Sequence, residues 1–184
     1  MIVIPTPLEG CLLIKPHIFN DDRGYFFESF NQLRFADATG FNVNFVQDNQ
    51  SYSTKGVLRG LHLQKGEFSQ AKLVRVTKGE VFDVAVDLRK GSPTYGQYHS
   101  VLLTEENNEQ FFIARGFAHG FIVLSDEAVF QYKCDNYYNK ESESGLHYAD
   151  PELNIDWRLS GSDVLVSDKD LELPFLKDAP DFGF

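Results

Sequence analysis

A succession of short β-rich segments separated by turn residues is the feature that most constrains this fold. The segments are rich in Val, Phe, Tyr and Thr, which favour strands over helices. Turn clusters such as Lys90–Gly96 separate them. Strands at this spacing predict a mainly β fold, either a sandwich or a jelly-roll barrel. The predicted strands are Val43–Ser53, Val57–Gln64, Gln70–Thr77, Val81–Leu88, Tyr98–Leu103, Gln110–Ile113, Gly120–Leu124 and Val129–Asn136.

Helices are few in the predicted structure. Residues Gln32–Thr39 form the one convincing internal helix, with Asn31 as its N-terminal cap and Gly40 as its stop. The tail from Asp150 is rich in loops, with a short helix expected near Leu171. No linker and no repeat divides the chain, so we expect a single domain over residues 1–184.

Composition excludes several functions. The 17 Phe and 8 Tyr supply much of the expected core, whereas the formal net charge of −10 argues against nucleic acid or an anionic membrane as the main partner. The first residues lack a basic leader, and Pro5, Pro7 and Glu9 interrupt their apolar runs. We therefore expect neither a signal peptide nor a membrane span, and a cytoplasmic protein. Cys11 and Cys134 are expected to be free buried thiols.

Residues 80–88 alternate between apolar and acidic side chains. Phe82, Val84, Val86 and Leu88 share one face of this strand, and Asp83, Ala85 and Asp87 share the other. An unpaired buried carboxylate is costly, so acids inside a barrel require donors or cations, for which Arg59, Lys72 and Arg75 are the nearby candidates. The alternative is that an acid faces solvent at a sheet edge, and Asp87 is the stronger case for it.

Two histidine segments resemble the two motifs of the cupin superfamily. "RGLHLQKGEFSQAKLVRVTKG" contributes His62, and "IARGFAHGFIVL" contributes His119. The resemblance implies a cupin-type jelly-roll β-barrel with a few short helices. Metal-binding cupins add a second histidine and usually a glutamate, but this chain has Gln64 and no acid better placed than Glu67. Because metal sites usually need at least three protein ligands, we expect no metal and expect His62 to be free for proton transfer.

Six blocks of the chain, in order and spacing, resemble the dTDP-4-dehydrorhamnose 3,5-epimerase family. They are "DDRGYFFESF", "QDNQSYSTKGVLRGLHLQ", "QAKLVRVTKGEVFDVAVDLRKGSPTYG", "GFAHGF", "YKCDNYY" and "SDKD", and they extend from about Asp21 to Asp170. One departure is Ala114, where the family favours proline; it touches a turn and no reactive group. Many activities share this fold, so the assignment rests on site residues.

The resemblance implies an isomerase that inverts carbons 3 and 5 of dTDP-4-dehydro-6-deoxy-D-glucose, in the biosynthesis of dTDP-L-rhamnose or a related deoxysugar. The substrate would be a dTDP-4-keto-6-deoxyhexose, and no cofactor is expected, because no glycine-rich dinucleotide turn is present. His62 would be the base, oriented by Asp170 or, as second choice, Asp83. Lys72 would stabilise the enolate oxygen. Tyr132, which shares a face with Phe130 and Cys134, would be the acid on the opposite side.

The same resemblance implies residues for the nucleotide and the sugar. Arg23 and Arg59 would bind the diphosphate, and residues near Arg23 would come from a partner subunit in a homodimer. Strict alternation places Arg59 and His62 on opposite faces, so Arg59 requires either a bulge at Gly60 or a different role. The other implied contacts are Phe26 stacked on thymine, Glu28 on its ring NH, Gln47 and Asn49 on base or phosphate, Tyr138 on the sugar, and His119, Glu143 and Lys169.

Three other functions are open. A relative on the same scaffold could invert carbon 3 alone, or carbon 5 alone, although the presence of both His62 and Tyr132 favours full epimerisation. A metal-dependent cupin oxygenase or isomerase would use His62, His119, Gln64 and Glu67. A non-catalytic protein that binds sugar nucleotides would exchange no protons.

Overall fold

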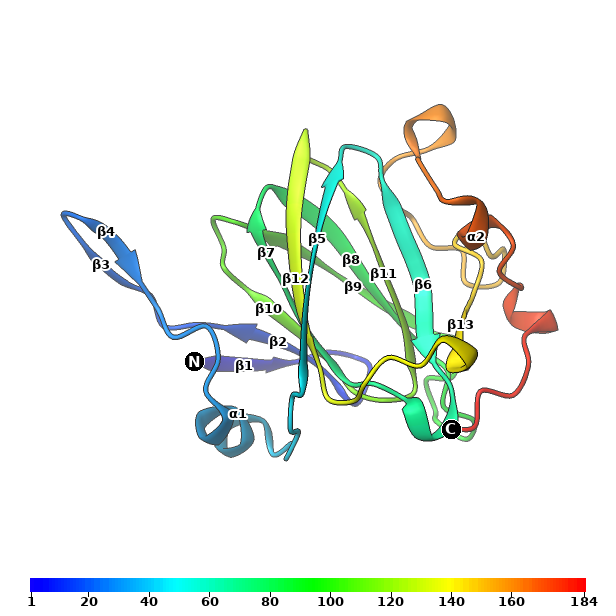
Figure 1. Ribbon diagram of the computed structural model, residues 1–184, viewed down its shortest axis with the longest axis horizontal. Coiled ribbons are helices and arrows are strands. Elements are labelled where there is room, and N and C mark those ends of the chain that lie inside the picture. The colour runs from blue at the N-terminus through cyan, green and yellow to red at the C-terminus, as the bar shows by residue number, and fades with distance from the viewer.

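The computed structural model describes residues 1–184 as two antiparallel sheets that enclose a core (Figure 1). The six-stranded sheet has the order β1 (Ile2–Pro5), β2 (Cys11–Lys15), β10 (Gln110–Ile113), β7 (Lys72–Lys78), β12 (Glu127–Cys134) and β5 (Gln47–Thr54). The five-stranded sheet has the order β13 (Glu143–Gly145), β6 (Leu58–Gln64), β11 (Phe117–Val123), β8 (Glu80–Asp87) and β9 (Tyr98–Thr104). A separate hairpin of β3 (Phe19–Asp21) and β4 (Gly24–Phe26) projects away from the barrel. The prediction of a mainly β jelly-roll is confirmed.

The predicted helix is found at the predicted residues. Helix α1 spans Gln32–Thr39, the Asn31 side chain accepts from the backbone N–H of Arg34, and Gly40 ends the helix at a φ of 76°. Only Phe35 of this helix is buried, against the six-stranded sheet. A four-residue helix, α2 (Asp168–Leu171), confirms the helix expected in the tail. The remaining helical turns are the 3-10 segments η1 (Gly66–Phe68), η2 (Lys140–Ser142), η3 (Gly161–Asp163) and η4 (Leu176–Asp178).

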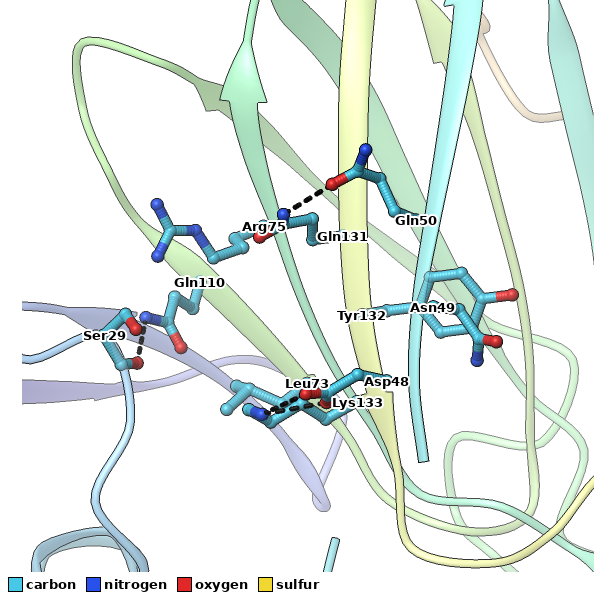
Figure 2. Close-up of a pocket in the computed structure, with 10 residues that line it drawn as sticks. All are labelled: Ser29, Asp48, Asn49, Gln50, Leu73, Arg75, Gln110, Gln131, Tyr132 and Lys133. Carbon is cyan, nitrogen blue, oxygen red and sulfur yellow. Dashed lines mark hydrogen bonds and ion pairs between the residues drawn. The ribbon is translucent and has the colours of Figure 1, made fainter. Parts of the chain in front are cut away.

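Side-chain alternation gives the six-stranded sheet two different faces. On β12, Tyr132 points toward the barrel interior, whereas Gln131 and Lys133 point outward. Figure 2 shows the Tyr132 ring on the opposite side of β12 from Arg75 and Gln110. These outward residues line a surface hollow of about 360 Å³.

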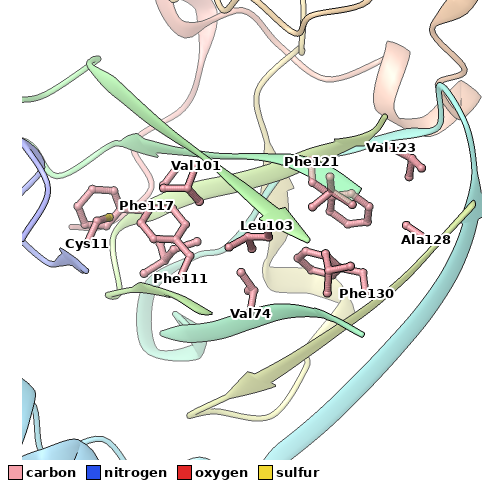
Figure 3. Packing of buried hydrophobic residues seen from close by; sticks show 14 of the residues in the cluster. Cys11, Val74, Val101, Leu103, Phe111, Phe117, Phe121, Val123, Ala128 and Phe130 are labelled. Carbon is pink, nitrogen blue, oxygen red and sulfur yellow. The ribbon is translucent and has the colours of Figure 1, made fainter. Parts of the chain in front are cut away.

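An apolar core fills one part of the space between the sheets (Figure 3). Val74, Phe111 and Phe130 of the six-stranded sheet meet Leu103 and Phe121 of the other. The rings of Phe121 and Phe130 are stacked with centroids 4.1 Å apart, and both rings also line an open cavity beside the core. The aromatic core therefore forms the floor of the candidate site.

A second apolar layer lies outside the five-stranded sheet. Phe82, Val84, Val86 and Leu88 pack there, as the alternation of β8 predicts. The C-terminal third covers them with residues that include Trp157, whose ring N–H donates to the Tyr148 carbonyl at 2.8 Å. This layer holds the tail against β6, which carries the first histidine motif.

Asp83 and Asp87 of β8 are both fully buried, so the solvent-facing alternative is wrong for each. Asp87 does not use any of the predicted cations, because the turn after β8 folds back and supplies Arg89, Ser92 and Thr94 as donors at 2.6–3.0 Å. Burial alone would raise the pKa of Asp87, but these hydrogen bonds lower it to about 2. Asp83 is bonded to His119.

The expectation for the cysteines has a direct structural counterpart. Cys11 and Cys134 are buried and unpaired, as predicted. No helix of the structure is long and apolar enough to cross a membrane.

Candidate active site

The candidate site is a polar cavity between the two sheets, with a volume of about 630 Å³. A neighbouring cavity of about 320 Å³ shares four of its residues, His62, Lys72, Asn49 and Tyr132. Of the residues predicted from the sequence, the first cavity also gathers Arg59, His119, Lys169 and Asp170, and the second gathers Gln47, Tyr138 and Glu143. Strands from both sheets therefore place most of the predicted residues around one space.

His62 and Asp170 form an imidazole–carboxylate pair although they are 108 positions apart. The His62 Nε2 lies 2.7 Å from Oδ1 of Asp170, and the backbone N–H of Gly60 donates to Oδ2 at 3.3 Å. The Asp170 side chain is nearly buried, while that of His62 is 32% exposed. Burial would raise the pKa of Asp170, but the hydrogen bond and charge of His62 outweigh it and the pKa is lowered. Of the two candidate partners, Asp170 is the one that contacts His62.

A bulge at Gly60 brings Arg59 and His62 to the same cavity. In the pairing of β6 with β11, His62 is opposite His119, but Arg59 is opposite Phe121, so β6 carries one extra residue. Gly60 has a φ of 123°, and a Cβ there would lie 2.5 Å from the Cα of Gly120. Only glycine fits this position. Of the two alternatives left open by the parity of Arg59 and His62, the bulge at Gly60 is the one found.

Lys72 and Tyr132 present polar ends to the cavities without a partner in the chain. No hydrogen bond or ion pair involves the Lys72 Nζ or the Tyr132 hydroxyl. Both atoms lack a partner without being fully buried. Burial lowers the pKa of Lys72, against the opposing influence of Cys134, Asp83 and Glu143. Burial raises the pKa of Tyr132. The Lys72 amino group and the Tyr132 phenol are thus available to a bound molecule.

Tyr138, Glu143 and Lys169 form a cluster at the edge of the site. The Tyr138 hydroxyl donates to Oε2 of Glu143 at 2.7 Å, and the Lys169 ammonium donates to Oε1 at 2.5 Å. Because Lys169 precedes Asp170 in α2, the cluster ties this helix to β13. Sequence reasoning missed Ser167, whose side chain accepts from the N–H of Asp170 at 3.2 Å. A serine before the acidic run "DKD" is a helix-cap signal that could have revealed it.

The residues of the N-terminal hairpin do not reach this cavity within one chain. Arg23 pairs with Asp21, and Phe26 is 69% exposed. Glu28 instead contacts Asn31 and Arg34 near α1. The hairpin extends away from the barrel in Figure 1, so Arg23 and Phe26 lie away from the cavity of their own chain.

The four residues of the alternative metal site are not arranged as a ligand set. Glu67 is exposed on η1, and the Gln64 amide oxygen accepts from the backbone N–H of Asn139 at 2.8 Å. His62 and His119 each direct Nε2 to a carboxylate, Asp170 and Asp83 respectively. No group of three or more His, Cys, Asp or Glu side chains is placed to hold a metal ion.

Comparisons with known proteins agree over nearly the whole chain. The family model described as dTDP-4-dehydrorhamnose 3,5-epimerase matches residues 5–178. The enzyme of that name from Methanothermobacter thermautotrophicus is 51% identical over 96% of this chain and 95% of its own.

Two solved structures are also similar. That of the dTDP-4-dehydrorhamnose 3,5-epimerase from Elizabethkingia anophelis has a TM-score of 0.93 at 53% identity, with 96% of each chain covered. That of the dTDP-6-deoxy-D-glucose-3,5-epimerase from Legionella pneumophila, in complex with dTDP-4-keto-L-rhamnose, has a TM-score of 0.92 at 51% identity and covers 97% of this chain and 94% of that one.

This similarity places the protein among the isomerases that act on dTDP sugars. More particularly, the chain belongs to the dTDP-4-dehydrorhamnose 3,5-epimerase family, and its activity is the 3,5-epimerisation of dTDP-rhamnose biosynthesis.

Proposed function

We propose that the His62–Asp170 pair performs both inversions by removing a proton from carbon 3 and from carbon 5 of a dTDP-4-keto-6-deoxyhexose. The ligand of the Legionella pneumophila structure supports this substrate class. Each C–H bond lies beside the carbon-4 ketone, so its electron pair can move into an enolate when the proton leaves. Asp170 accepts from Nε2 of His62, which leaves the lone pair of the neutral ring on Nδ1 as the base.

Lys72 stabilises the enolate in this mechanism. Its ammonium group has no partner in the chain, so it is free to donate to the carbon-4 oxygen as negative charge develops there. Charge placed in advance at such an oxygen is commonly the largest catalytic contribution. Because the ammonium needs no rearrangement during the reaction, it lowers the barrier more than it strengthens substrate binding.

Tyr132 returns a proton to the opposite face of the carbanion. Its raised pKa keeps the phenol protonated at neutral pH, so that it can act as the acid. Inversion results because the proton leaves to His62 on one side and arrives from Tyr132 on the other. The imidazolium and the tyrosinate then return to their starting states by exchanging protons with water.

The nucleotide end of the substrate requires more than one chain in this proposal. Arg59 faces the cavity, held by a hydrogen bond from its Nε to the Ser53 hydroxyl at 3.1 Å. The hairpin exposes Phe26 and Tyr25 by more than 60% each, and aromatic residues are enriched in subunit interfaces. We propose a homodimer in which Arg23 and Phe26 of each hairpin, together with Glu28 just after it, complete the partner's cavity.

The contact between His62 and Asp170, in a cavity shared with Lys72 and Tyr132, is the single observation that carries the mechanism. It is tested by incubating the keto-sugar nucleotide in deuterated water and following carbons 3 and 5 by NMR. We expect deuterium at both carbons, and none with His62→Ala. Deuterium at carbon 3 alone would restrict the activity to that carbon. Tyr132→Phe should still exchange deuterium but form little inverted product, and normal product formation would remove the acid role.

The dimer proposal has a separate test. His62→Ala and Arg23→Ala are each expected to be nearly inactive. After the two variants are mixed and allowed to exchange subunits, heterodimers combine the intact His62 of one chain with the intact Arg23 of the other. Recovery of activity supports a shared site, whereas a mixture as inactive as its components contradicts it.

A further inference from the structure

Gln64 is a buried amide with one hydrogen-bonding group left unused. It follows His62 by two positions in β6, so both side chains face the space between the sheets, and Gln64 is only 5% exposed. Its Oε1 accepts from the backbone N–H of Asn139 at 2.8 Å. Because a backbone N–H can only donate, the oxygen faces Asn139 and the NH2 group faces away from it.

This NH2 group has no acceptor in the chain. The only fully buried side-chain nitrogen or oxygen atom without a partner is Nε of Arg75, so Nε2 of Gln64 is not sealed inside the protein. Gln64 lines the cavity of about 320 Å³ that also contains His62 and Lys72. The NH2 group is therefore a free donor at that cavity.

Gln70 presents the opposite group to the same cavity. Its Nε2 donates to the Asn136 carbonyl at 2.8 Å, which leaves its Oε1 turned away from that carbonyl. No group of the chain donates to this Oε1, and Gln70 lines the same cavity as Gln64. Gln70 therefore contributes a free acceptor.

One loop holds both amides at the same end of the cavity. Their backbone partners, Asn136 and Asn139, both lie in the loop between β12 and η2. No hydrogen bond joins Gln64 to Gln70, so neither satisfies the free group of the other. An unused donor or acceptor in a buried position costs free energy, which a ligand with a matching group would recover.

The two free groups fit a ligand group that both donates and accepts. A carbonyl oxygen would accept from Gln64 but leave Gln70 without a donor, and an ammonium group would leave Gln64 without an acceptor. A hydroxyl group satisfies both amides. In the hexose of the proposed substrate, only carbons 2 and 3 carry a hydroxyl group.

The arrangement of the two cavities favours the hydroxyl on carbon 3. Arg59, which the proposed function assigns to the diphosphate, lines the cavity of about 630 Å³ but not the cavity of Gln64. The diphosphate is attached to carbon 1, so carbon 3 lies farther from Arg59 than carbon 2 does. Lys72, the proposed partner of the carbon-4 oxygen, lines both cavities, which brings the adjacent carbon 3 to the cavity of the two glutamines.

We propose that Gln64 and Gln70 form a recognition site for the hydroxyl group on carbon 3 of the sugar. Gln64 donates to the hydroxyl oxygen, and the hydroxyl donates to Oε1 of Gln70. The inference rests on the proposed function, because it concerns the same substrate. It assigns both glutamines to specificity and neither of them to proton transfer.

The first test compares the keto-sugar nucleotide with its 3-deoxy and 2-deoxy analogues. All three compounds keep an acidic hydrogen on carbon 5, so deuterium exchange at this carbon is one readout for all of them. A donor and an acceptor left without their hydroxyl group weaken binding of the transition state. We expect kcat/KM of the wild-type protein to be about ten- to a hundredfold lower for the 3-deoxy analogue than for the parent.

Gln64→Met keeps the length of the side chain but removes the donor. The ratio of kcat/KM between the parent and the 3-deoxy analogue should lose most of its wild-type value in this variant, while the ratio for the 2-deoxy analogue stays unchanged. Because the variant also releases the loop at Asn139, Asn136→Ala is the matched control. That change removes the Asn136 side-chain bond to the Glu67 carbonyl at 2.8 Å and loosens the same loop, but leaves both glutamines in place. Both ratios should stay at their wild-type values in it.

Four results would overturn the proposal. They are equal kcat/KM of wild-type protein for the parent and the 3-deoxy analogue, full discrimination by folded Gln64→Met, an equal loss of discrimination in Asn136→Ala, and an effect of Gln64→Met on the 2-deoxy ratio alone. The wild-type comparison does not depend on the folding of any variant.

Binding separates this proposal from the proposed mechanism. Calorimetric titration of His62→Ala, which should not turn the ligands over, gives a Kd for the parent and for each analogue. Weaker binding of the 3-deoxy analogue supports the glutamine site even if wild-type protein exchanges no deuterium, a result that would refute the mechanism alone. Equal Kd values for the parent and the 3-deoxy analogue would overturn the glutamine site.

Discussion

Replacing Asp170 with asparagine tests the pairing on which the mechanism depends. The change keeps the size of the side chain but removes the negative charge that faces the ring of His62 across a 2.7 Å hydrogen bond. When the base takes a proton, the charge centres of imidazolium and carboxylate lie about 4 Å apart, and their attraction at an effective dielectric of about 20 is about 4 kcal/mol. At about 1.4 kcal/mol per factor of ten, kcat should fall about a thousandfold.

The loss has a second contribution in the same direction. The asparagine amide can turn its NH2 group toward Nε2, which would place the ring proton on Nδ1 and block the base. KM should change much less than kcat, because Asp170 faces His62 and supports it from behind. A rise in KM with unchanged kcat would indicate a role in substrate binding instead.

The assay is the initial rate of deuterium exchange at carbons 3 and 5 of the keto-sugar nucleotide. Asp168→Asn is the matched control, since it removes the same charge from an exposed position of the same helix and should keep wild-type rates. Circular dichroism and thermal unfolding establish that both variants are folded. Exchange by folded Asp170→Asn within tenfold of the wild-type rate would refute the pairing as a source of catalysis.

Three further predictions follow from individual residues. Lys72→Met should lower kcat about a hundredfold or more. Because burial lowers the pKa of Lys72, the wild-type rate should decline as the pH rises, starting below the usual lysine pKa of 10.5. A wild-type rate that does not change with pH up to 10.5 would contradict the role of Lys72. Gly60→Ala should lower the free energy of unfolding by about 2 kcal/mol or more, because the added Cβ would overlap the backbone of Gly120. The same change should raise KM, because it displaces Arg59. A change of less than about 0.5 kcal/mol in urea unfolding would contradict the prediction. Asp87 has a folded pKa of about 2, below the ordinary aspartate value of 3.8, so its contribution of about 2.5 kcal/mol is fully present above pH 3.8 and is lost as the pH falls toward 2. The stability difference between wild-type protein and Asp87→Asn should therefore shrink over that pH range in urea titrations, and a pH-independent difference would contradict the pairing.

Local signals account for the parts of the fold that the sequence predicts well. Helix α1 is found at its predicted residues because Asn31 and Gly40 mark its ends through contacts within a few positions. The start of β5 is different: the prediction began at Val43, but the Val43 carbonyl accepts from the side chain of Gln32 and the strand begins at Gln47. Strands β1 to β4 and β13 were not predicted, because they are short and a distant partner or a turn defines each of them.

The candidate site also has features that local sequence predicts and features that it does not. The alternatives of a bulge at Gly60 or a different role for Arg59 follow from parity within one strand, so they can be derived from four consecutive residues. The choice between Asp83 and Asp170 cannot, because strand periodicity says nothing about a carboxylate 108 positions from its histidine. Only the family resemblance ranked Asp170 first. The choice between a buried and a solvent-facing Asp87 stayed open because its donors come from a turn whose path no alternation pattern describes.

The C-terminal third, which packs outside the barrel and delivers Asp170 on α2, has a consequence for biosynthesis of the enzyme. A nascent chain that has emerged from the ribosome only through β12 already contains His62, Lys72 and Tyr132, but the proposed base, His62, has no carboxylate behind it. The same applies to a product of premature termination or of proteolysis before residue 165. Such fragments would bind sugar nucleotide weakly or not at all and would leave it unchanged, so catalytic competence arrives only with the last stretch of polypeptide.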